Sequence, residues 1–231
     1  MHKTMITAHS GCEGTPDNSL ASIETGIALG ADCVEIDIRA DHAGKLWLTH
    51  DRPQDYTGLV PLEEAFALIR KSGIAVNCDL KEYGALLPTL QLADKYDLSK
   101  DQLIFSGSVD PSLLEKTPEI ARRSRIFLNS EELTRDLTKA ELPGREEQTA
   151  YLLENAALAA ERLHALGAAA LNAPYKHMPD ALIDAMRARD IALSLWTLNE
   201  EPALREFMTK DLLNITTRMP SLALTVRNAL Q

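Results

Sequence analysis

Short apolar runs alternate with longer helix-like stretches along the whole chain. Eight runs of apolar or β-branched residues predict strands, at Met5–Ala8, Cys33–Ile38, Ala75–Leu80, Gln102–Phe105, Ser124–Leu128, Ala168–Leu171, Ile191–Trp196 and Leu213–Thr216. The stretches between them repeat apolar residues at helical spacing and predict helices, near 18–29, 62–71, 85–96, 111–115, 131–140, 149–166, 180–189, 201–209 and 221–230. No linker or repeat interrupts the pattern, which predicts one domain over residues 1–231.

Strand–helix alternation that reaches eight units favours a (β/α)8 TIM barrel, and a doubly wound open sheet is the alternative. The segment Cys33–Asp51 departs from the alternation, because it is strand-like on both sides of a turn at Asp41–Gly44. We therefore predict a β-hairpin extension at the second strand. A turn centred between His42 and Ala43 would place Glu35 opposite His50.

Composition and charge narrow the function classes. The 231 residues include 24 basic and 34 acidic side chains, a net charge of −10, whereas nucleic-acid binding needs a basic face. No apolar run approaches the length of a membrane span, and a strand predicted from Met5 leaves no room for a signal peptide. Three cysteines without a CxxC pair indicate reduced thiols, so we expect a cytoplasmic protein. The oligomeric state stays open.

Carboxylates gather at the ends of two predicted strands. Glu35 and Asp37 share one face of the second strand, and Asp79 ends the third. In a barrel, the carboxyl ends of the strands meet at one mouth. Three carboxylates brought together there would repel one another, and a divalent cation would relieve the repulsion. Oxygen ligation suits Mg²⁺ or Ca²⁺ better than Zn²⁺.

Three further side chains complete the candidate site. Lys81 shares the face of Asp79 and supplies positive charge for an anionic substrate. His9 and His50 also follow strands and are candidates for acid and base. A histidine at a strand end is often structural, so the conjunction of these residues carries the hypothesis.

The motifs at these positions resemble the glycerophosphodiester phosphodiesterase family. Its pattern of AHRG, PENT, GAD-x-hydrophobic-E-hydrophobic-D and HD is similar to AHSG at 8–11, PDNS at 16–19, GADCVEID at 30–37 and LTHD at 48–51. Weaker similarity follows in order, with PLEEA at 61–65, NCDLK at 77–81, FSGS at 105–108, LWTLN at 195–199 and ITTRMP at 215–220.

The resemblance implies a (β/α)8 barrel and metal-assisted cleavage of a small phosphodiester. By position it makes His9 and His50 the acid–base pair, has Glu35, Asp37 and Asp79 hold the metal, and directs Lys81 to the phosphate. Trp196 would form the wall on the alcohol side, although an aromatic of a barrel layer is an equal alternative. The products would be an alcohol and a phosphomonoester, glycerol 3-phosphate.

Four departures from the family pattern bear on the substrate. Ser10 stands where the family has arginine, which binds phosphate with a planar fork. Arg39 could substitute, or could be a solvated arginine at the rim. Asp79 and Thr217 stand where the family has glutamate and aspartate. The family's long insertion is reduced to about ten residues between Asp51 and Leu62.

Two other functions remain open on these departures. The chain could be a non-catalytic or repurposed relative that binds a phosphorylated ligand. It could also be a lyase that releases a cyclic phosphate, in which a hydroxyl of the substrate attacks the phosphorus. The sequence does not choose between that attack and attack by water.

Overall fold

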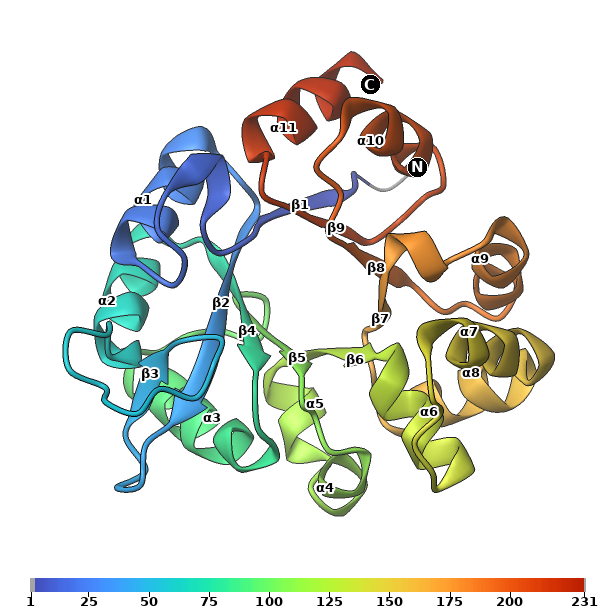
Figure 1. The fold of residues 1–231 in the computed structure, drawn as a ribbon, viewed down its shortest axis with the longest axis horizontal. Coiled ribbons are helices and arrows are strands. Elements are labelled where there is room, and N and C mark those ends of the chain that lie inside the picture. Colours follow the sequence, from blue (N-terminus) through green and yellow to red (C-terminus); the bar gives the residue numbers. More distant parts are fainter. Residues whose placement is uncertain (1–2, 231) are drawn as a thin grey trace.

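Eight parallel strands close into a barrel in this computed structural model, which describes residues 3–230 (Figure 1). Around the ring the order is β1, β2, β4, β5, β6, β7, β8 and β9, with β9 paired to β1. The strands are β1 (Met5–Ala8), β2 (Cys33–Ala40), β3 (Leu46–Leu48), β4 (Ala75–Leu80), β5 (Leu103–Gly107), β6 (Arg125–Asn129), β7 (Ala170–Pro174), β8 (Leu193–Trp196) and β9 (Asn214–Thr217). The predicted (β/α)8 barrel is confirmed.

Helices surround the barrel, as Figure 1 shows. They are α1 (Leu20–Leu29), α2 (Leu62–Ser72), α3 (Leu86–Lys95), α4 (Pro111–Lys116), α5 (Glu119–Arg123), α6 (Ser130–Thr138), α7 (Arg145–Glu154), α8 (Ala156–Ala165), α9 (Asp180–Arg187), α10 (Glu201–Met208) and α11 (Pro220–Ala229). The helix predicted over 149–166 is two helices that meet at Asn155. The short α5 was not predicted, because five residues show no helical period. No helix in the described part of the chain is both long and apolar enough for a bilayer.

The alternation of side chains along the strands separates two cores. Outward residues such as Ile36, Ile38 and Leu80 are buried against the helices in the main core. Inward residues at the start of the strands fill the barrel's lower end, where Cys33 packs with Ile104, Phe127 and Ala170. Polar and charged inward residues follow above this plug, so the upper end of the barrel is left for a site.

The predicted hairpin is present, but the predicted register is wrong. β3 runs antiparallel to β2 and pairs only with its outer end, with Ile38 opposite Leu48 and Ala40 opposite Leu46. The observed pairing is shifted by one residue from the predicted one, so Glu35 does not face His50. The conformation of the turn accounts for this shift. The Asp41 side chain accepts hydrogen bonds from the backbone N–H groups of Ala43 and Lys45 and so holds the loop in this conformation.

Candidate active site

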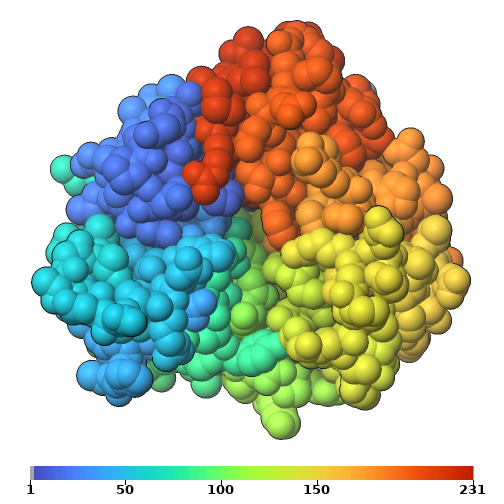
Figure 2. All heavy atoms as spheres, in the orientation of Figure 1, coloured from blue at the N-terminus to red at the C-terminus, as the bar shows by residue number. Residues whose placement is uncertain are grey.

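A cavity of about 340 Å³ opens at the upper end of the barrel. In the space-filling view of the same orientation, the surface is hollowed at its centre (Figure 2). Most of the residues that line this cavity are polar or charged and stand at strand ends or in the loops that follow the strands. The sequence predicts the candidate side chains at this end of the barrel. The cavity lining includes His9, Glu35, Asp37, His50, Asp79, Lys81 and Trp196.

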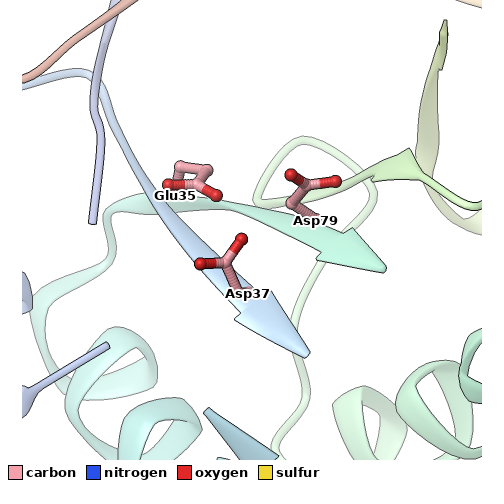
Figure 3. Close-up of side chains that lie close together, drawn as sticks. All are labelled: Glu35, Asp37 and Asp79. Carbon is pink, nitrogen blue, oxygen red and sulfur yellow. The ribbon is translucent and has the colours of Figure 1, made fainter. Parts of the chain in front are cut away.

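Three carboxylates converge on one wall of the cavity. Register brings them together, because Asp37 of β2 lies beside Asp79 of β4, with Glu35 two residues below Asp37 on the same face. One oxygen from each carboxylate lies within 4.8 Å of the others. Figure 3 shows the three groups turned toward one another. Glu35 and Asp37 are each only 4% exposed, so the charge they concentrate is poorly screened by solvent.

Lys81 bridges two of these carboxylates. Its Nζ lies 2.8 Å from Asp37 Oδ1 and 2.7 Å from Asp79 Oδ2. Burial opposes charge on Lys81, but the two carboxylates outweigh it and raise the lysine pKa. Burial also opposes ionisation of Asp37, yet Lys81 and Asn18 lower its pKa overall. For Asp79 burial dominates and raises the pKa.

Glu35 is the one carboxylate of the three that is not paired with Lys81. Burial raises its pKa well above the usual range, and the charges of Asp37 and Asp79 raise it further. The backbone N–H of Ser10 donates to Glu35 Oε2 at 2.8 Å, which acts in the opposite direction and lowers the Glu35 pKa. A cation placed among the three carboxylates would remove the repulsion that Lys81, bound to the other two, leaves at Glu35.

Two buried oxygens of this wall have no hydrogen-bond partner among the described residues. They are Asn77 Oδ1 and Asp79 Oδ1, and both residues line the cavity. Buried polar atoms are normally satisfied, so orphaned acceptors mark a place for a missing donor or cation. With hard oxygen donors and no thiol or imidazole in the group, the site fits a divalent cation that prefers oxygen ligands.

Asn18 and Ser10 support the carboxylates from the loop after β1, and sequence analysis missed this role. The Asn18 side chain donates to Asp37 Oδ2 at 2.8 Å and accepts from the Asp37 backbone N–H at 3.0 Å. The Asn18 backbone N–H donates in turn to Ser10 Oγ at 2.5 Å. The N-cap of α1 is Ser19, whose side chain accepts from the Ser22 backbone N–H. The side chain of Asn18 is thereby free to reach Asp37.

His9 stands over the carboxylates with a defined tautomer. Its Nδ1 lies 2.7 Å from the Ser10 carbonyl oxygen. A carbonyl can only accept, so Nδ1 carries the proton and Nε2 keeps its lone pair. Burial lowers the His9 pKa below its usual value, although the bond to Ser10 acts in the opposite direction. Neutral His9 is therefore suited to accept a proton.

His50 lies on the cavity rim in a more open position. Its side chain is 67% exposed, and Nδ1 lies 2.9 Å from the carboxylate of Asp51, which is 94% exposed. This carboxylate is placed to orient the imidazole of His50. The loop holds His50 through its backbone, since Arg39 Nε donates to the His50 carbonyl oxygen at 2.8 Å.

Arg39 does not line the cavity. Its guanidinium is engaged at the rim by the carbonyl oxygens of His50 and Lys81 and by the carboxylate of Glu82. The structure therefore places Arg39 where it braces the β2–β4 edge.

The wall across from the carboxylates was only partly predicted. Trp196 at the end of β8 lines it, together with Glu131 and Glu132 of α6 and Arg145 of α7. The Arg145 guanidinium lies 5.2 Å from the centre of the Trp196 ring. Asn172 lies within 3.3 Å of the Trp196 indole nitrogen. Arg145 escaped sequence analysis because its segment has no motif and its helix was expected to begin only at residue 149.

Comparisons with known proteins point to one family. A family model described as "Glycerophosphoryl diester phosphodiesterase family" matches residues 9–60, the stretch that holds both histidines and two of the carboxylates. A curated glycerophosphodiester phosphodiesterase of Caldanaerobacter subterraneus subsp. tengcongensis is 28% identical over 145 residues, 55% of this chain. The match spans 58% of that relative's length.

Solved structures share the fold over nearly the whole chain. A glycerophosphodiester phosphodiesterase from Parabacteroides distasonis superposes with a TM-score of 0.75 at 18% identity, covering 99% of this chain and 98% of its own. An Oleispira antarctica phosphodiesterase in complex with the product sn-glycerol-3-phosphate gives a TM-score of 0.73 at 18% identity, covering 97% and 96%. At these identities the likeness establishes the barrel.

Proposed function

We propose that this chain, which is related to the glycerophosphodiester phosphodiesterase family, is a metal-dependent phosphodiesterase. It would hydrolyse a glycerophosphodiester, or a related small phosphodiester, to an alcohol and glycerol 3-phosphate. The observation that carries the proposal is the convergence of His9 and a bridging lysine on three carboxylates, two of them buried, at one cavity wall. The O. antarctica neighbour, which holds sn-glycerol-3-phosphate, supports a small-molecule substrate of this class.

Glu35, Asp37 and Asp79 would hold Mg²⁺ or Ca²⁺, the cations that prefer carboxylate oxygens. Such an ion polarises a phosphoryl oxygen and neutralises charge that develops in the transition state. Lys81 stands against the same carboxylates and would bind a non-bridging phosphate oxygen as a compact cation. Asn18 would keep Asp37 oriented, as partners of metal ligands do elsewhere.

His9 would act as the base and His50 as the acid. Neutral His9 with a lone pair on Nε2 can take a proton from the attacking hydroxyl or water. His50, which Asp51 orients, would donate a proton to the departing alkoxide. His50 is exposed at the rim, where an alcohol product can leave. Trp196 would form the alcohol side of the cavity.

The three cysteines bear on where this reaction takes place. Cys12, Cys33 and Cys78 are free and buried, and unpaired thiols are usual in a reducing compartment. We therefore propose a cytoplasmic location for the reaction.

A substrate panel tests the function. Glycerophosphocholine, glycerophosphoethanolamine and glycerophosphoglycerol are each incubated with Mg²⁺, Ca²⁺ or EDTA, and released alcohol and phosphomonoester are quantified. Turnover should require a divalent cation and fall at least about 100-fold in His9→Ala and His50→Ala, the usual loss for a missing acid or base. Full activity in both variants, or in EDTA, contradicts the proposal. A cyclic phosphate as the end product would instead identify a lyase.

A further inference from the structure

The strand order sets the two walls of the cavity against each other. In the closed ring, β8 stands four strands from β4 in either direction, so Trp196 faces the side on which Asp79 and Lys81 lie. The phosphodiester would bind at the carboxylate wall. The wall of Trp196 and Arg145 would then meet the organic part of the substrate, which makes its chemistry informative about the alcohol.

Arg145 occupies an unfavourable position in its own helix. It is the first residue of α7, after Gly144 at the N-cap, where the helix dipole favours anions and opposes cations. The next two residues, Glu146 and Glu147, follow the usual preference. A cation at this end is a local cost that folding does not require, and such departures concentrate at functional sites.

The guanidinium of Arg145 is held in place yet keeps unused donors. It stacks near Trp196 at 5.2 Å, which limits where it can move. Within residues 3–230 its one charged partner is Glu131, at 3.4 Å, longer than a good charge-assisted bond. Five N–H donors thus meet a single distant acceptor. The side chain is 39% exposed and lines the cavity.

The acidic neighbours of Arg145 are already engaged. Glu132 accepts from the Tyr83 hydroxyl and from Arg135, both at 2.8 Å, and burial raises its pKa. Glu131 accepts from Asn129 at 3.3 Å in addition to Arg145. The Arg145 guanidinium already lies over the Trp196 ring at 5.2 Å, the kind of position in which a quaternary ammonium group would bind. This wall is therefore better suited to an anion than to a cation.

We propose that Arg145 selects substrates whose alcohol carries an anionic group, such as a carboxylate. The inference rests on the proposed function of the same cavity and adds the class of alcohol. Arg145 binds the anion of the alcohol through its free donors, while Trp196 keeps the guanidinium oriented. Lys81 and the carboxylate wall serve the phosphodiester, so the two anionic groups of the substrate are bound at opposite sides.

Two substrates that differ by one carboxylate test this selection. Glycerophosphoserine is glycerophosphoethanolamine with a carboxylate added, so their kcat/KM ratio isolates that group. The native protein should favour the serine diester by about 10-fold or more, as expected for a charge-assisted contact. Arg145→Gln should lose about 10-fold on the serine diester, chiefly in KM, and change the ethanolamine diester by less than about 2-fold.

Matched variants distinguish selection of the alcohol by Arg145 from a contact with the phosphate and from a purely structural role. Arg205→Gln removes an arginine from an exposed pair with Glu201 on α10 and should leave the ratio unchanged. Glu131→Gln frees Arg145 and should raise the ratio. Equal losses on both substrates in Arg145→Gln would assign Arg145 to the phosphate, and no loss on either would make it a partner of Glu131 only. Either result overturns the proposal.

Binding measurements keep the inference testable if neither diester is cleaved, an outcome that counts against the proposed function. Calorimetry with O-phosphoserine and with phosphoethanolamine then compares the same carboxylate without turnover. The native protein should bind O-phosphoserine about 10-fold more tightly, and Arg145→Gln should bind the two equally. Equal affinities in the native protein would overturn the inference independently of catalysis.

Discussion

Gly107 controls the position of a proposed metal ligand, and replacing it with alanine should damage the site from outside it. Gly107 ends β5 with φ +76 and is paired with Leu80 of β4, the residue after Asp79. A Cβ on Gly107 would lie 2.1 Å from Asp79 Oδ1 and 2.3 Å from the Leu80 carbonyl oxygen. Real Cβ atoms do not come so close, so Asp79 and the adjoining backbone must shift.

The expected cost has two parts. An L-residue at this φ costs about 1 kcal/mol, and overpacking against a buried strand adds about 2 kcal/mol. A loss of about 3 kcal/mol lowers the melting temperature of a protein of this size by about 9 °C. Displacement of Asp79 should also weaken metal binding by at least about 10-fold.

Gly73→Ala is the matched control for Gly107→Ala. Gly73 follows α2 with the same φ of +76, but a Cβ there would meet nothing within 4 Å. This variant should lose about 1 kcal/mol, or about 3 °C, and should bind Mg²⁺ and Ca²⁺ as the native protein does. Thermal denaturation and calorimetric metal titration measure both effects. Equal losses of stability and unchanged metal affinity in the two variants would refute the steric reasoning.

Three further outcomes follow from the same site. Because burial and neighbouring charges raise the pKa of Glu35 and metal ligands must be deprotonated, metal affinity should keep rising as the pH rises above the ordinary carboxylate range, with proton release measured by calorimetry in two buffers; affinity independent of pH would contradict this. Asn18→Gly keeps the φ of 53 but loses both bonds to Asp37, so metal affinity should fall about 10-fold; unchanged affinity would count against its positioning role. Burial raises the pKa of Cys33 to about 12, so this thiol should resist a disulfide reagent at pH 8 until urea is added, and rapid native labelling would disagree.

The sequence predicts the barrel because its determinants are local. Each strand is a short apolar run, and the first and third, at Met5–Ala8 and Ala75–Leu80, have the predicted bounds. Charged residues at strand ends could be placed because alternation and the barrel's single mouth leave few arrangements. The hairpin register was predicted wrongly by one residue. The Asp41 side chain bonds to the backbone of the turn, and the pattern of apolar residues does not show such bonds.

Residues that act across long sequence separations were not predictable in the same way. Arg145 of α7 reaches Trp196 of β8, and no local sequence pattern predicts that contact. Asparagine just before a helix is commonly a cap, so the sequence does not indicate that Asn18 bonds to Asp37. Only the structure shows these bonds. The ion pair of Arg39 is another example, because its partner Glu82 comes from the loop after β4.

Phosphorus NMR of glycerophosphoethanolamine hydrolysis is the most direct test of a phosphodiesterase at the carboxylate wall. The native protein, Glu35→Gln and a sample in EDTA are followed with excess Mg²⁺ in the first two. We expect the diester resonance to give way to that of glycerol 3-phosphate only in the native protein with metal. Loss of the diester at the native rate in Glu35→Gln or in EDTA would contradict cleavage at this site.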